Sequence, residues 1–189
     1  QKAGGGESRE PFLVGAPGQE VTGDLFLHEP VVRLVAIERL DHPVTPSPHR
    51  PFAVLEEAIG LKLDPRSLLV TWHPVTLEPG RTWEGFEALL SVLSQLEGVQ
   101  ILFTKANADT EGRIINQMID KYVAAHPGNT IAYTSLGQLR YLSAMKHVDG
   151  VVGNSSSGII EAPSFSTGTV NIGDRQRGRV RADSIIDCD

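Results

Sequence analysis

The sequence has little of what marks secreted, membrane or nucleic-acid-binding proteins. It contains a single cysteine, Cys188, which excludes an internal disulfide and is compatible with a reducing compartment. No apolar run approaches the roughly 20 residues that a membrane-spanning helix needs. The polar stretch Gln1–Glu10 lacks the apolar core of a signal peptide. We therefore expect a cytoplasmic protein without a membrane partner.

Positive charge is also scarce. The 17 lysines and arginines are outnumbered by 23 acidic residues, which gives a formal net charge of −6. A nucleic-acid footprint needs clustered positive charge, so we expect no nucleic-acid partner. The one basic cluster lies near the end of the chain, at Arg175, Arg177, Arg179 and Arg181. Aromatic residues make up only 6% of the chain, whereas 40% of it is hydrophobic, which is enough for one sizeable core.

The chain begins with its least regular part. Residues 1–10 include three consecutive glycines and are expected to form a flexible arm, with one lobe over residues 11–189. Within residues 19–50, to which we assign no role, Pro30–Leu40 has the apolar spacing of a helix face. Phe12–Val14 is a candidate strand, whereas the prolines between residues 42 and 51 predict irregular structure.

From residue 52 onward, helix-like and strand-like patterns alternate. This alternation indicates parallel βαβ units, so the predicted fold class is α/β, with a Rossmann-like parallel sheet and helices on both faces. Ligands of such sheets bind outside the carboxyl ends of the strands, so the loops after the strands should share one cleft. The predicted helices are Phe52–Gly60, Thr82–Leu96, Thr110–Ala125 and Leu136–His147, and the predicted strands are Ser67–Thr71, Val99–Phe103, Thr130–Tyr133, Gly150–Val152, Thr169–Ile172 and Ser184–Asp187.

The most informative stretch is Gly153–Glu161, where a buried strand runs into a Ser/Gly-rich turn and a short helix. The first turn of a helix has unpaired N–H groups and partial positive charge, and small or hydroxyl-bearing residues let a phosphate approach it. Glu161 follows Ser155 by about one and a half turns, where a carboxylate suits the paired hydroxyls of a ribose. The alternative is that Asn154 or Ser155 only caps the helix.

Other loops contribute histidine, amide and guanidinium groups. His73 can donate to a phosphate or give a proton to a leaving group, or it only packs in place. Asn107 can bind a ligand, or it only makes the turn with Asp109, which caps the next helix. Tyr141 can stack on a base, or it belongs to the core. Arg175 offers a planar fork for phosphate, or it belongs to a solvated loop. Together on one edge, these groups suit a nucleoside diphosphate.

Several ordered motifs resemble the hydrolysing UDP-N-acetylglucosamine 2-epimerases of sialic-acid biosynthesis, from about Phe12 to the end of the chain. That family has two Rossmann-like lobes, as in GT-B glycosyltransferases, with the UDP-sugar bound between them. The resemblance implies that this chain is the carboxyl-terminal, UDP-binding lobe, without the catalytic amino-terminal lobe and the last helices. The motifs are His73-Pro74-Val75-Thr76, Asn107-Ala108-Asp109, Gly153-Asn154-Ser155-Ser156-Ser157-Gly158 with Glu161, and Gly173-Asp174-Arg175-Gln176-Arg177-Gly178-Arg179.

The resemblance also implies a reaction. In the family, a base removes the proton at sugar C2, UDP leaves from C1 to give 2-acetamidoglucal, and water then adds to yield N-acetylmannosamine and UDP. No metal or other cofactor is required, the full-length parent is expected to be a homo-oligomer, and this chain alone is expected to be inactive. By this resemblance His73 lies near the diphosphate and is also the candidate catalytic residue. The other implied contacts are Asn107 on the nucleotide, Tyr141 against the uracil, Ser155 and Ser156 on the diphosphate, Glu161 on the ribose, and Arg175 after the next strand.

Other functions remain open at this point. The non-hydrolysing relatives usually carry an Asp-Ser-Gly-Gly turn, so Asn154–Gly158 favours the hydrolysing group. The sugar is alternatively of the diacetylated bacillosamine type. A donor-binding lobe of a GT-B glycosyltransferase is a third enzyme interpretation, and a non-catalytic nucleotide-binding module is a fourth.

Overall fold

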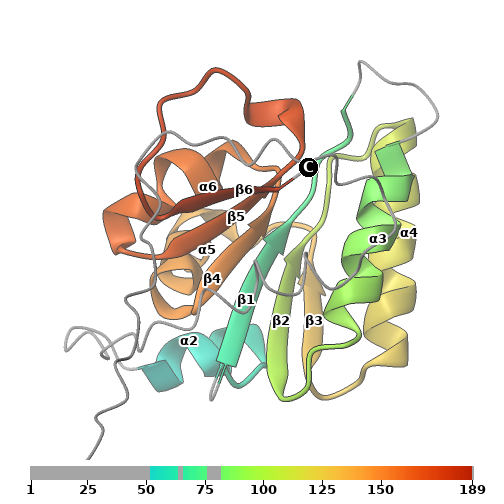
Figure 1. The fold of residues 1–189 in the computed structure, drawn as a ribbon. Coiled ribbons are helices and arrows are strands. Elements are labelled where there is room, and N and C mark those ends of the chain that lie inside the picture. Colours follow the sequence, from blue (N-terminus) through green and yellow to red (C-terminus); the bar gives the residue numbers. More distant parts are fainter. Residues whose placement is uncertain (1–51, 64–65, 76–81, 189) are drawn as a thin grey trace, which may run out of the picture.

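The computed structural model describes residues 52–63, 66–75 and 82–188 (Figure 1). A six-stranded sheet of order β3-β2-β1-β4-β5-β6, parallel throughout, runs through the described part, which confirms the predicted α/β class. The expected arm at residues 1–10, the strand at 12–14 and the helix within 30–40 lie outside the described residues.

The strands begin and end within one residue of their predicted bounds. Short runs rich in Val, Ile and Leu fit strands that are buried on both faces of a parallel sheet. The strands are β1 Arg66–Thr71, β2 Val99–Thr104, β3 Thr130–Tyr133, β4 Gly150–Gly153, β5 Gly168–Ile172 and β6 Ile185–Cys188.

The helices also follow the prediction, except at one end. α3 was expected to reach Leu96 but ends at Leu93, because the chain tightens there, with Leu96 N donating to Leu93 O at 3.2 Å. The structure adds two short 3₁₀ turns that periodicity did not indicate, η1 Ala162–Phe165 and η2 Asp174–Gln176. The α-helices are α2 Phe52–Ile59, α3 Thr82–Leu93, α4 Thr110–Ala125, α5 Gly137–His147 and α6 Ser156–Ile160.

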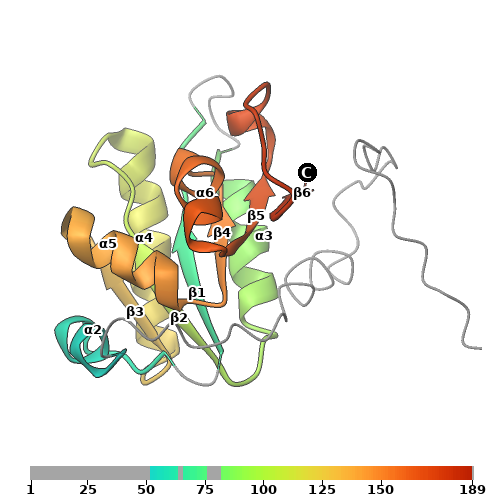
Figure 2. The same cartoon turned by 90° about the vertical axis from the view of Figure 1, so that its left-hand side faces the viewer.

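The sheet separates two apolar cores. Figures 1 and 2 show from two sides the helices that cover its faces. Side chains alternate along a strand, so Leu68 and Val70 of β1 join the core under α3 and α4. Leu69, between them, joins the core under α2 and α5. Helices therefore cover both faces, as predicted. None of the helices in the described part of the chain is long and apolar enough to cross a bilayer.

Apolar spacing along α4 predicts an inward stripe of Ile114, Ile115, Met118, Ile119 and Val123, and the buried residues of the helix differ from it at two positions. Ile115 and Ile119 are buried as expected, but Ile114 is 43% exposed. Tyr122 takes the next turn of the buried stripe, and its ring packs edge-on against Phe103. Residues spaced by three or four lie on one helix face, which favours Tyr122 over Ile114 beside this pair.

The order of the strands reverses between β1 and β4. From β1 the chain moves outward through α3 and α4 to β3, and α5 then carries it back across to β4 on the other side of β1. The loops after β1 and β4 therefore leave the sheet toward opposite faces, at the end drawn at the top of Figure 1. A crevice between two such loops is where ligands of open α/β sheets bind.

Candidate functional site

Asn154, the first residue after β4, joins three loops at this switch point. Its side chain is 1% exposed and clamps the main chain of His73, whose N–H donates to Asn154 Oδ1 at 2.7 Å, while Asn154 Nδ2 donates to His73 O at 2.8 Å. Its carbonyl accepts from Arg175 Nη1 at 3.1 Å and from Gln176 Nε2 at 2.9 Å. The loops after β1, β4 and β5 are thus fixed to one another.

This junction depends on the close approach of β4 to β1 at Gly153. Asn154 N donates to Thr71 O at 3.2 Å, and a Cβ on Gly153 would lie 2.0 Å from that same oxygen. The φ angle of Gly153 is +135°, which side-chain-bearing residues rarely adopt. Only glycine therefore lets the serine-rich turn start directly above β1.

The charge of Arg175 acts on His73. Partial burial lowers the pKa of His73, the guanidinium of Arg175 lowers it further, and the carboxylate of Asp109 opposes both effects. Burial also lowers the pKa of Arg175, with a smaller contribution from Arg179, although an arginine stays charged at neutral pH. The site therefore combines a largely neutral imidazole with a fixed positive charge, and the loop after β2 lies within electrostatic reach.

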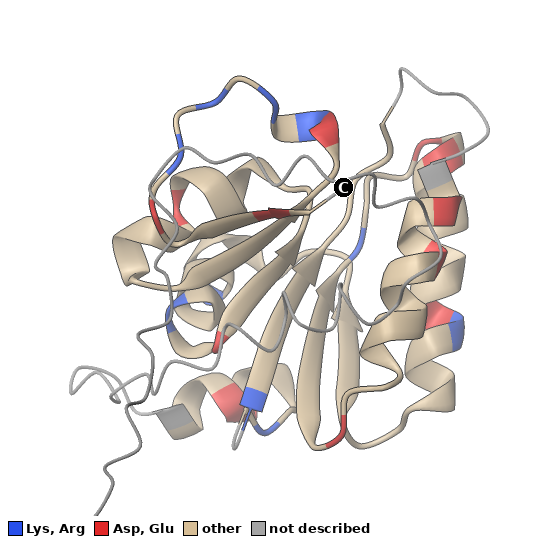
Figure 3. Ribbon diagram, viewed as in Figure 1, with Lys and Arg blue, Asp and Glu red and all other residues tan. Residues whose placement is uncertain are grey.

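The serine turn has the cap geometry that one alternative predicted. Ser155 is the N-cap of α6, and its side chain accepts from Ser157 N. α6 has only five residues, so few peptide dipoles add up there. Positive charge at this edge comes instead from the loop after β5, where Figure 3 shows a run of blue. Within that loop, Arg177 pairs with Asp174 at 3.4 Å.

Tyr141 lies on α5 with its hydroxyl directed at the serine turn. The hydroxyl bonds Ser157 Oγ and lies 3.5 Å from Thr71 Oγ1. The residue is partly buried and packs against the core under α2 and α5. The structure thus connects Tyr141 with the predicted diphosphate-binding turn through its polar tip.

The loop after β2 has a clamp of its own. Asn116 accepts from Ala106 N at 2.8 Å and donates to Ala106 O at 3.0 Å. Asp109 caps α4 by accepting from Gly112 N at 2.6 Å, as the alternative interpretation of this loop predicted. Asn107 stands between Ala106 and Asp109 in the sequence and is exposed. No hydrogen bond among the described residues joins it to Asn154.

Glu161 follows α6 and has an unusual environment. Its Oε2 is buried, yet it accepts no hydrogen bond within the described residues. A buried oxygen without a donor is costly, and such a group calls for an explanation such as an absent ligand. The main-chain N–H of Glu161 donates to Ser157 O at 2.9 Å, so the residue is fixed to the serine turn.

Sequence reasoning missed two residues of this site. Both stand within the quoted motifs, but Asn154 was assigned a role only as a helix cap, and none was assigned to Gln176, which is 2% exposed. The partners of Asn154 lie 81 and 22 residues away, and no local pattern encodes pairings at such distances. The available signal was an asparagine placed directly after a strand-ending glycine.

Comparison with known proteins agrees with the motif resemblance. The family described as UDP-N-acetylglucosamine 2-epimerase matches residues 35–189. The GDP/UDP-N,N'-diacetylbacillosamine 2-epimerase (hydrolyzing) of Campylobacter jejuni is 44% identical over 133 residues, which are 70% of this chain and 35% of that protein. The polysialic acid biosynthesis protein P7 of Escherichia coli is 37% identical over 123 residues, 65% of this chain and 31% of that protein.

A third relative has a similar extent. The UDP-N,N'-diacetylbacillosamine 2-epimerase (hydrolyzing) of Legionella pneumophila is 34% identical over 136 residues, 72% of this chain and 35% of that protein. The chain thus spans about a third of the length of the curated relatives it matches. The matched region includes every motif quoted above, and the chain belongs to the UDP-N-acetylglucosamine 2-epimerase family.

Proposed function

We propose that this chain is the UDP-binding lobe of a hydrolysing nucleotide-sugar 2-epimerase. The observation that carries the proposal is the Asn154 junction, which brings His73, Arg175 and the serine turn to one edge of the sheet. A guanidinium, an imidazole and several hydroxyls suit the two phosphates of UDP. The names of two relatives, which include the word hydrolyzing, support the hydrolysing branch.

The nucleoside end of the ligand has its own candidate partner. The carboxylate of Glu161 has a buried oxygen that lacks a donor among the described residues, and the 2′ and 3′ hydroxyls of a ribose are donors of the right kind. In this arrangement, Ser155 and Ser156 contact the diphosphate and Asn107 contacts the nucleotide. Glu161 then gives the site its preference for a nucleotide over a free phosphate.

The proposed reaction divides between this lobe and the rest of the enzyme. A base outside this chain takes the proton from C2 of the sugar, and the C2–H electron pair forms the C1=C2 double bond. The C1–O bond breaks at the same time, and its electron pair leaves with UDP. Negative charge grows on the leaving oxygen, and Arg175 and the serine hydroxyls are placed to stabilise it. Bound phosphate raises the proton affinity of His73, so the imidazolium can donate to the departing UDP.

The ribose contact can be tested on the 189-residue chain. Glu161→Ala removes the acceptor and is expected to weaken uridine and UDP binding by about 1–3 kcal/mol, the scale of hydrogen bonds to a charged group. Calorimetric titration with both ligands measures the loss, and inorganic pyrophosphate serves as the ligand control because it has no ribose. Equal losses for pyrophosphate and UDP would contradict a ribose contact.

The reaction itself requires the full-length protein. Proton NMR of the reaction with UDP-N-acetylglucosamine distinguishes the branches, since free N-acetylmannosamine supports the hydrolysing branch and UDP-N-acetylmannosamine the other. The same assay should be repeated with UDP-N,N'-diacetylbacillosamine as the substrate, because two relatives are named for that compound. Transfer of the sugar to an acceptor, with no free sugar, would favour a glycosyltransferase instead.

A further inference from the structure

A chain of hydroxyl groups runs from the buried ends of β1 and β2 to the serine turn. Thr104 Oγ1 and Thr71 Oγ1 lie 2.6 Å apart, and Thr71 Oγ1 lies 3.5 Å from the hydroxyl of Tyr141. The Tyr141 hydroxyl bonds Ser157 Oγ, which lies 2.9 Å from Ser155 Oγ. Tyr141 is the link between the sheet and the turn.

The aromatic ring of Tyr141 is used in packing. It belongs to the partly buried side chains around the core under α2 and α5, together with Tyr133 and Phe165. Its hydroxyl is therefore held at a fixed place, since both ends of the side chain have neighbours. This packing gives the ring a role that needs no contact with a base.

We propose that Tyr141 is a positioning residue of the diphosphate site, and that it acts through its hydroxyl rather than by stacking on the base. Its hydroxyl fixes the rotamer of Ser157, and Ser157 in turn orients the hydroxyl of Ser155 toward the ligand. Because hydroxyls rotate freely, a turn rich in serine needs such a link to present its donors in one direction. This inference rests on the proposed function, because it concerns the serines assigned to the diphosphate.

Two substitutions separate the hydroxyl from the ring. Tyr141→Phe keeps an aromatic ring and removes only the hydroxyl, so we expect UDP affinity to fall about tenfold while uridine affinity stays unchanged, as the loss of one ordered hydrogen-bond link implies. Tyr141→Ala removes both. Calorimetry with UDP, and NMR titration with the weaker ligand uridine, provide the measurements on the 189-residue chain.

A matched control is available on the same face of the sheet. Tyr133 also packs against the core under α2 and α5, and its hydroxyl donates to Ile59 O at 2.9 Å. Tyr133→Phe therefore removes one tyrosine hydrogen bond away from the serine turn. We expect it to lower the free energy of unfolding about as much as Tyr141→Phe does, and to leave UDP affinity unchanged.

The outcomes decide between the two roles of Tyr141. Loss of UDP affinity in Tyr141→Phe, with uridine binding retained, supports the positioning role. Wild-type UDP affinity in Tyr141→Phe overturns it, and a loss of uridine binding confined to Tyr141→Ala identifies the ring as a base platform instead. A wild-type chain that binds no UDP removes the proposed function itself, whereas an unchanged Tyr141→Phe variant removes only this inference.

Discussion

Truncation of Asn154 tests the junction on which the site depends. Asn154→Ala leaves the His73 N–H and carbonyl without the partners that lay at 2.7 and 2.8 Å. An unpaired buried polar group costs about 1–3 kcal/mol, and water reaches the half-buried His73 in part, so we expect a loss of about 2–4 kcal/mol in unfolding free energy. A domain of this size has about 5–15 kcal/mol, so the variant should still fold.

The same change should weaken ligand binding at one point of the site. The carbonyl of Asn154 remains in the variant, so Arg175 and Gln176 keep their hydrogen bonds, and only the loop after β1 is released. We expect UDP affinity to fall about five- to thirtyfold, since a histidine that must be ordered on binding adds an entropic cost of about 1–2 kcal/mol. Urea denaturation and calorimetry with UDP measure the two effects.

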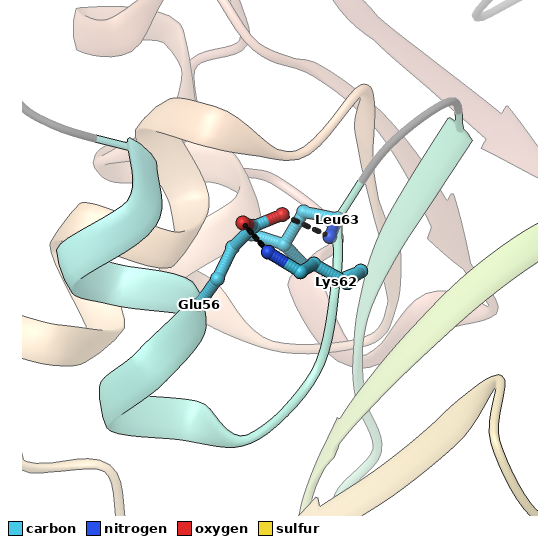
Figure 4. A network of polar contacts seen from close by, with 3 residues as sticks. All are labelled: Glu56, Lys62 and Leu63. Atoms are coloured by element: carbon cyan, nitrogen blue, oxygen red, sulfur yellow. Dashed lines mark hydrogen bonds and ion pairs between the residues drawn. The ribbon is translucent and has the colours of Figure 1, made fainter.

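Glu56→Ala is the matched control for stability. Figure 4 shows Glu56 of α2 beside Lys62 and Leu63, in the segment that leads into β1 and thus at the opposite edge of the sheet. Glu56 accepts from Leu63 N at 2.9 Å and pairs with Lys62 at 3.0 Å. Its loss should cost about 1–3 kcal/mol without affecting UDP binding, because the binding loops are untouched. Unchanged UDP affinity in a folded Asn154→Ala variant would refute the junction as the basis of the site.

Three further predictions concern stability. Gly153→Ala should cost more than about 2 kcal/mol in thermal or urea unfolding, because its Cβ meets Thr71 O, whereas Gly128→Ala, also at positive φ but in open space, should cost less. Burial alone raises the pKa of Glu56, but its hydrogen bonds and ion pair outweigh this and leave the pKa below 4.5. Glu56 therefore stabilises the folded chain above about pH 4.5, and the difference in unfolding free energy between wild type and Glu56→Ala should narrow at lower pH. Burial lowers the pKa of His73 below 6.5, so the unfolded chain binds the proton at a higher pH than the folded chain does. The unfolding free energy should therefore fall as the pH drops below about 6.5, and His73→Gln should flatten this dependence in urea unfolding measured against pH.

The architecture was predictable because each element carries a local signal. Runs such as Leu68–Val70 are apolar without interruption, as strands buried on both faces must be, and the stripe of α3 repeats at helical spacing. Gly60 directly after α2 marked the end of that helix and adopts positive φ, whereas Gly98, also at positive φ, lies five residues beyond the end of α3 at Leu93. The rule that ligands bind beyond the carboxyl ends of the strands then located the candidate site.

The parts that were missed depend on contacts between distant residues. Ile114 was wrongly expected in the buried stripe of α4 and Tyr122 was left out of it, because apolar character alone does not decide which neighbours face the sheet. The direction of the Tyr141 hydroxyl depends on how α5 packs beside the serine turn, which spacing does not encode. The role of Asn154 as a junction follows from the crossing of α5, which brings β4 beside β1.

The most direct test of the central claim is an amide NMR titration of the 189-residue chain with UDP. We expect the largest shifts at His73, at the serine turn 155–157 and at Arg175, all in one saturable process. Shifts confined to the opposite edge of the sheet, around Glu56 and Leu63, or no shifts at millimolar UDP, would contradict the proposed site.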